Sequence, residues 1–284
     1  MKTRQRSLRL IALLVALALL CAAVPASVLL AYAAEYREYT VEKEASDAQF
    51  DFAGNYVAPE LTIDGVRDDA YIFVVNGCTQ IAEMENAEAS SFYDEYVGNG
   101  WEGAVSVWAY RGETAIYFFF QVLDTTLESS ATSPGDAVTH EDSVEIYLDP
   151  LMDGGNNPQM DDIQLNIGLS GYTRKMLGTG SQWGTYSALM DFEIMTFGTL
   201  NDRTDIDSGY TVEIMLPYAQ INANMTKDTP VGIAFANVTR ASGDDEWVGL
   251  ELYDNVQTPG RYYVLDENNN FYWTYEAYRA SLTK

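Results

Sequence analysis

The stretch that decides the fold runs from His140 to Pro150 and reads HEDSVEIYLDP. Apolar and polar residues alternate through it, so that valine, isoleucine and leucine share one face. Side chains of a β-strand point alternately to its two faces, and one apolar face predicts a strand that covers a core. The other face places a carboxylate, Glu145, beside an aromatic ring, Tyr147.

Similar stretches occur along most of the chain. The segment 114–123 is β-branched and aromatic and is apolar on both faces, as in a central strand. Helical periodicity is scarce, apart from one turn expected at 218–221. About ten strands separated by short turns predict an all-β fold, a β-sandwich of the jelly-roll or immunoglobulin-like kind. The expected strands are 103–110, 114–123, 142–149, 162–169, 186–197, 209–216, 230–239, 247–253 and 261–265.

The N-terminus differs from the rest of the chain. Four basic residues precede an uncharged run over 10–34, and Ala31-Tyr32-Ala33 fits a signal peptidase site. The run is also long enough to span a membrane. We therefore expect a signal peptide or an N-terminal membrane anchor over 1–34, an acidic linker over 35–55 and one domain over 56–284. In both cases the basic flank stays in the cytoplasm, so the rest is expected to be secreted or at the cell surface.

The composition excludes several classes of function. The chain has 42 acidic and 16 basic residues, a net charge of −26, and four of the basic residues lie in the first 34 positions. So acidic a domain is not expected to bind nucleic acid or anionic lipid, which leaves the N-terminal segment as the only expected membrane attachment. His140 and Cys78 are the only histidine and cysteine after position 34, which disfavours a zinc site and a catalytic triad.

Two groups of residues carry binding chemistry. Glu145 beside Tyr147 suits sugar recognition, because a carboxylate accepts hydrogen bonds from hydroxyl groups and a ring packs on the apolar face of a sugar. An exposed strand face is the alternative. The next loop, residues 149–162, reads DPLMDGGNNPQMDD and offers the oxygen ligands that calcium prefers. A solvated acidic loop is the alternative there. The candidate calcium ligands are Asp149, Asp153, Asp161 and Asp162.

Several stretches in order resemble one family, the family 9 carbohydrate-binding modules and their relatives. The opening LTIDGVRDDAY (61–71), the central EDSVEIYLD (141–149) with DDIQLNIG (161–168) after it, and SGYTVEIMLPY (208–218) each resemble a family element. The resemblance implies a sandwich that binds a poly- or oligosaccharide on its concave face without cleaving it. It also implies structural calcium, and that Glu145 faces the sugar with Gln164 and Asn166 on the next strand.

The chain departs from the family at the aromatic residues. Sugar-binding members have a tryptophan just before the central strand, where this chain has Thr139. Trp183 and Tyr253 are therefore the candidate sugar platforms. The expected function is an exported, non-catalytic carbohydrate-binding protein. The alternatives are a scaffold or adhesion domain without sugar binding, a haem protein that uses His140 with Met160 or Met176, and a glycosidase, for which 42 acids supply carboxylates but no motif.

Overall fold

The computed structural model describes residues 38–40, 58–77, 104–154, 157–240, 263–272 and 279–283. The chain divides into two compact units, Met1–Glu38 and Tyr39–Lys284. The expected signal or anchor segment and most of the expected linker lie outside the described residues. Within the ranges above, no helix has both the length and the hydropathy needed to cross a membrane.

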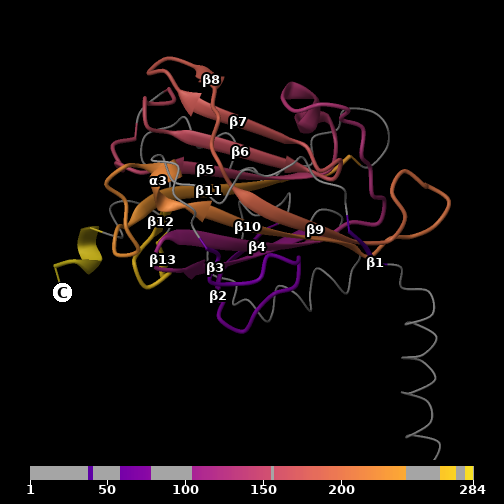
Figure 1. Ribbon diagram of the computed structural model, residues 1–284, viewed down its shortest axis with the longest axis horizontal. Coiled ribbons are helices and arrows are strands. Elements are labelled where there is room, and N and C mark those ends of the chain that lie inside the picture. The colour runs from indigo at the N-terminus through magenta and orange to yellow at the C-terminus, as the bar shows by residue number, and fades with distance from the viewer. Residues whose placement is uncertain are drawn as a thin grey trace, which may run out of the picture. The chain divides into compact units, whose positions relative to one another are not determined.

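The described strands form two sheets (Figure 1). The first sheet follows the order β1 (Glu38–Thr40), β9 (Asp191–Phe197), β10 (Gly209–Pro217), β4 (Ala115–Leu123), β3 (Ala104–Arg111) and β2 (Ile72–Gly77). The second sheet follows the order β13 (Phe271–Tyr272), β12 (Tyr263–Leu265), β11 (Val231–Val238), β5 (Ser143–Asp149), β6 (Ile163–Gly168), β7 (Thr173–Gly178) and β8 (Trp183–Thr185). The ladders from β9 to β2 and from β13 to β8 are antiparallel.

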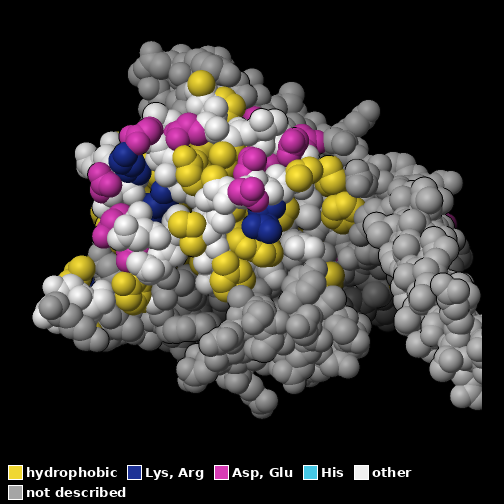
Figure 2. Space-filling view, turned by 90° about the horizontal axis from the view of Figure 1, so that it is seen from below, with side chains coloured by type: hydrophobic (Ala, Val, Ile, Leu, Met, Phe, Trp, Pro, Cys, Tyr) yellow, Lys and Arg dark blue, Asp and Glu magenta, His cyan; other side chains and the backbone are white. Residues whose placement is uncertain are grey.

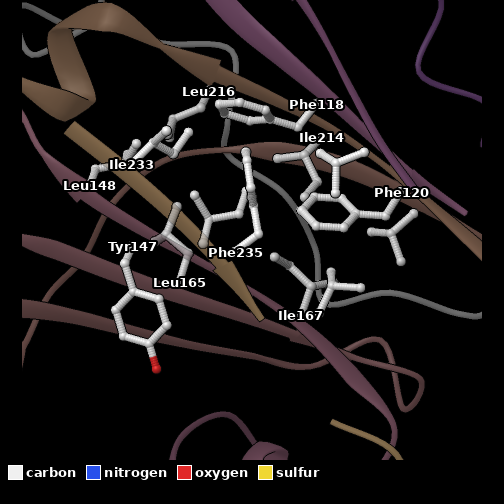
Figure 3. Close-up of a cluster of buried hydrophobic side chains, with 14 of the residues drawn as sticks. Phe118, Phe120, Tyr147, Leu148, Leu165, Ile167, Ile214, Leu216, Ile233 and Phe235 are labelled. Atoms are coloured by element: carbon white, nitrogen blue, oxygen red, sulfur yellow. The ribbon is translucent and has the colours of Figure 1, made fainter. Parts of the chain in front are cut away.

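The two sheets face each other across one apolar core. Phe118 and Phe120 on β4 meet Phe235 on β11, with ring centroids 5.7 and 5.6 Å apart and nearly perpendicular ring planes (Figure 3). Edge-to-face packing of this kind adds to the free energy gained by burial. The apolar side chains of β5 belong to the same core, as the alternation of HEDSVEIYLDP predicts. The predicted all-β sandwich is therefore confirmed.

The strand boundaries largely follow the prediction, with instructive exceptions. The one helical turn expected at 218–221 is α3 (Tyr218–Ile221). Strands β7 and β8 were not expected, because TRKMLG carries two adjacent cations and WGT is very short. β8 is the last strand of the second sheet and β7, which pairs with β6 and β8, is the next to last, and most of their side chains are only partly buried. Backbone pairing therefore replaces the burial that gives a central strand its pattern. The expected strand at 247–253 lies outside the described residues.

Strand β10 repeats the pattern of β5 in the other sheet. Its glutamate, Glu213, points away from the core but is fully buried. One carboxylate oxygen accepts hydrogen bonds from the backbone N–H groups of Asp64 and Gly65, at 2.9 and 3.0 Å. The other accepts a hydrogen bond from the Tyr71 hydroxyl at 2.8 Å. Glu213 therefore fastens the LTIDGVRDDAY segment to the outside of the first sheet, and Gly65 turns there with φ +78°.

Candidate functional site

Four side chains form what we call the polar cluster, on the face of the second sheet turned away from the core. Glu145 and Tyr147 come from β5, and Asn166 and Gln164 stand directly opposite them on β6. The Tyr147 ring points away from the phenylalanines of the core (Figure 3). All four side chains are buried, with 4% exposure or less. The predicted grouping of Glu145, Gln164 and Asn166 is present, as a buried cluster instead of an open polar surface.

The polar cluster is linked by hydrogen bonds that converge on Glu145. Tyr147 donates its hydroxyl to Glu145 Oε2 at 2.5 Å, and the Asn166 amide donates to Glu145 Oε1. Gln164 Nε2 donates to the Tyr147 hydroxyl at 3.0 Å. Each carboxylate oxygen has two lone pairs, so Glu145 keeps acceptor capacity. Asn166 Oδ1 is buried and has no hydrogen-bond partner among the described residues.

The electrostatics of Glu145 reflect competition between burial and its neighbours. Burial raises the pKa of the Glu145 carboxyl, while the hydrogen bond from Tyr147 and the positive charge of Arg174 lower that pKa. Arg174 lies on β7, directly opposite Asn166 in the ladder. Sequence reasoning missed Arg174, although Arg174 and Lys175 are the only adjacent cations in the chain.

Of the two candidate sugar platforms, Trp183 and Tyr253, only Trp183 lies in the described part of the chain. Trp183 on β8 is half-buried, and its ring centroid lies 6.3 Å from that of Tyr147 with the planes inclined at 54°. Trp183 therefore borders the polar cluster and keeps part of its surface exposed, as a sugar platform requires. Tyr253 lies outside the described residues. Thr139 lies in the short helix η3 (Asp136–His140), where its hydroxyl donates to the Asp136 carbonyl at 2.8 Å.

The acidic loop, residues 149–162, joins β5 to β6 and brings its ends together. Carboxylate oxygens of Asp149, Asp161 and Asp162, which we call the three-aspartate group, lie within 4.8 Å of one another. Backbone N–H groups of the loop bind one oxygen of each: Gly154 to Asp149 at 3.0 Å, Leu151 to Asp161 at 3.1 Å and Gln159 to Asp162 at 2.7 Å. Asp153, the fourth predicted ligand, is exposed and outside this group.

The three-aspartate group has the oxygen ligands and the negative charge of a cation site. Burial, with repulsion from Asp149 and Asp161, raises the pKa of Asp162 to about 7 against the effect of its hydrogen bond from Gln159. Asp162 Oδ1 is buried and has no hydrogen-bond partner among the described residues. Clustered carboxylate oxygens on a loop are ligands that calcium prefers. The residues present therefore fit a bound calcium ion.

Two acids of the opening stretch, Glu141 and Asp142, have structural roles. Glu141 is fully buried and accepts hydrogen bonds from Ser130 and Ala131 on one side and Ser170 on the other. Asp142 accepts hydrogen bonds from the N–H groups of Glu128 and Arg240, both at 2.6 Å. The partners are distant in sequence, so no local pattern identified them.

The structure gives little support to the haem and glycosidase alternatives. His140 is exposed at the end of η3, and Met160 is 76% exposed on the acidic loop. Met176 borders a cavity whose described lining includes neither of these two residues. That lining contains a single carboxylate, Asp136, whereas glycoside hydrolysis usually needs a pair.

Two antiparallel sheets around a shared core, with a polar cluster and an acidic hairpin loop, define the class of this protein as a β-sandwich. A family model described as carbohydrate family 9 binding domain-like matches residues 80–256, more than half of the chain. The chain therefore belongs to this family, which confirms the resemblance drawn from the motifs. No curated protein matches the chain.

Solved structures with similarity to the chain include two of a family 9 carbohydrate-binding module from Caldicellulosiruptor kristjanssonii. The complex with cellotriose is 17% identical, covers 67% of this chain and 78% of the module, and has a TM-score of 0.42. The complex with glucose is 18% identical, covers 67% and 80%, and has a TM-score of 0.43. A putative carbohydrate-binding protein from Bacteroides uniformis is 11% identical, covers 58% and 83%, and has a TM-score of 0.38.

Proposed function

We propose that this chain is an exported, non-catalytic protein that binds a poly- or oligosaccharide on the outer face of the second sheet. Family membership supports carbohydrate binding as the class of function. The observation that carries the site is the polar cluster, where Glu145 keeps acceptor capacity beside the unpartnered Asn166 Oδ1. Sugar hydroxyl groups are the donors that would use these acceptors, and Trp183 borders the cluster as an aromatic platform.

The proposal includes a calcium ion held by the three-aspartate group. Its role is to neutralise three clustered carboxylates and to close the loop between β5 and β6, the two strands that carry the polar cluster. The pairs Leu148–Ile163 and Tyr147–Gln164 link that loop directly to the cluster. Calcium is therefore expected to support sugar binding through the position of the strands, without contact to the sugar.

The experiment is a binding titration of the full chain with a panel of mono- and oligosaccharides that begins with cellotriose and glucose, the ligands of the two similar module structures. Trp183→Ala and Asn166→Ala are expected to weaken binding at least tenfold and to leave the circular dichroism spectrum unchanged. Trp108→Ala is the matched control, because Trp108 lies in the first sheet. The proposal fails if no sugar in the panel binds, or if Trp183→Ala and Trp108→Ala have equal effects on affinity.

One observation favours a second candidate, a scaffold or adhesion domain of the same fold. The polar cluster is buried, and Glu145, Tyr147 and Gln164 bind one another. Such a cluster also suits a domain that keeps the strands in register and has no ligand. The same titration separates the two candidates, because the scaffold predicts that the Asn166→Ala variant changes stability alone.

A further inference from the structure

A cavity of about 530 Å³ lies along β7, the strand next to the polar cluster. Its walls come from β7, from the segment 185–190 that leads into β9, and from residues 134–136 at the start of η3. Pockets for small ligands typically have volumes of about 300 to 1,000 Å³, so the cavity has room for a sugar unit. The start of η3 is fixed to β7, because the Gly135 N–H donates to the Thr173 carbonyl at 3.1 Å.

The lining of this cavity has an unusual charge for this protein. Arg174 and Lys175 both line it, against one carboxylate, Asp136. The chain as a whole has 42 acidic and 16 basic residues. On the face of the molecule that Figure 2 shows, acidic groups lie among hydrophobic ones and basic side chains occupy few places. Arg174 and Lys175 follow each other on β7, so their side chains point to opposite faces of the sheet, and Arg174 is the one on the face of the polar cluster, opposite Asn166. The guanidinium group of Arg174 makes this cavity attractive to an anion that the rest of the surface repels.

The Arg174 side chain pairs with Asp136 and still has donors to offer. Its Nε donates to Asp136 Oδ1 at 3.0 Å, and the Arg174 side chain forms no other hydrogen bond within the described ranges. The Arg174 side chain is 17% exposed, whereas that of Asp136 is 89% exposed. An ion pair with so exposed a partner contributes little to stability, because solvent screens it. A carboxylate that forms two parallel bonds with the guanidinium group is able to replace Asp136.

The rest of the lining suits the body of a sugar. Thr185 and Ser187 bring hydroxyl groups that exchange hydrogen bonds with sugar hydroxyls. Met176, Met190 and Phe192 bring apolar surface for the C–H face of the ring. Together with Arg174, the lining matches a sugar that carries a carboxylate.

We propose that this cavity binds a hexuronate unit of a glycan, with the carboxylate of the sugar held by Arg174. The inference rests on the proposed function and names the ligand class. Asp136 then acts as a competitor that occupies Arg174 while the cavity holds no ligand. Thr185 lines the cavity and Trp183 lies two residues before it on β8, so a longer glycan is expected to reach both places.

The test is isothermal titration of the full chain with a trimer of galacturonic acid and with its methyl ester, which has the same shape and no charge. The acid is expected to bind at least tenfold more tightly than the ester, and the preference is expected to shrink in 0.5 M salt because charges are screened. Arg174→Gln is expected to remove the preference for the acid. Asp136→Asn is expected to strengthen binding of the acid several-fold, because it removes the competing carboxylate.

Arg203→Gln is the matched control, because Arg203 is half-exposed, pairs with Glu128 away from the cavity and carries the same charge. Equal affinity for acid and ester, or equal effects of Arg174→Gln and Arg203→Gln, overturns the inference. If the hexuronate inference fails in this way but neutral sugars bind and Trp183→Ala weakens that binding, the proposed function stands and only the hexuronate inference is overturned. If neither acidic nor neutral glycans bind, both proposals are overturned. Binding of a sulfated trimer in preference to the uronate also overturns the assignment.

Discussion

Glu213→Gln is expected to change how the stability of the protein depends on pH. Glu213 is fully buried and accepts three hydrogen bonds, from Asp64, Gly65 and Tyr71. The three bonds lower the pKa of its carboxyl, but burial outweighs them and raises that pKa from 4.5 to about 6. Folding therefore favours the protonated carboxyl, and this contribution to stability is present below pH 4.5 and is lost as the pH rises through 6.

The size of the effect follows from the pKa shift. A shift of about 1.5 units corresponds to about 2 kcal/mol, because one unit is worth about 1.4 kcal/mol. Glutamine has nearly the same shape as glutamate and does not titrate in this range. The free energy of unfolding of Glu213→Gln minus that of the wild type is therefore expected to rise by about 2 kcal/mol between pH 4 and pH 7.5.

The assay is urea unfolding, followed by circular dichroism, of both proteins at four pH values from 4 to 7.5. Tyr71→Phe is the second variant. It removes one of the three hydrogen bonds to Glu213 and is expected to steepen the loss of stability with rising pH. The reasoning is refuted if the free energy of unfolding of Glu213→Gln minus that of the wild type stays constant, or falls, as the pH rises. A fall would mean that the hydrogen bonds outweigh burial and that the pKa of Glu213 is depressed.

Three further outcomes follow from the structure. Phe235→Ala is expected to reduce the free energy of unfolding by about 3 to 5 kcal/mol, measured in urea, because this ring meets two others between the sheets. Gly168→Ala is expected to cost about 1 to 3 kcal/mol, because a Cβ there would lie 2.0 Å from Glu141 Oε1, whereas Gly184→Ala, with its nearest contact at 3.1 Å, is the milder control. Calcium is expected to raise the melting temperature more at pH 7.5 than at pH 5, because protons compete for Asp162, and equal shifts at both pH values would contradict the three-aspartate site.

The sequence predicted features that depend on short-range patterns. Alternation in HEDSVEIYLDP places Glu145 and Tyr147 on one face of β5, and the structure confirms this. The ends of the acidic loop meet because two antiparallel strands flank it, so three of its four predicted ligands converge. The turn after Pro217 was predictable for a similar reason, because a proline ends the strand and presets the backbone of the helix that follows.

Other features depend on contacts between residues far apart in the chain, and no local sequence pattern predicts them. Glu141 looks like any surface acid, because its hydrogen-bond donors lie 10 to 29 residues away. Arg174 reaches the polar cluster only because β7 pairs with β6 in a register that sets it opposite Asn166. Strands near the end of a sheet, such as β7, need few apolar residues, so hydrophobic alternation does not identify them.

The bond between Glu213 and the LTIDGVRDDAY segment also has a kinetic consequence. It joins residues 149 positions apart in the chain, whereas the β5–β6 hairpin is closed by the acidic loop alone. Closing so long a loop is entropically unfavourable, so contacts of this kind are expected to form late, after the transition state for folding. Loss of the three hydrogen bonds to Glu213 should then accelerate unfolding and leave the folding rate nearly unchanged. The glutamate would in that case set how long the native sandwich lasts once it has formed.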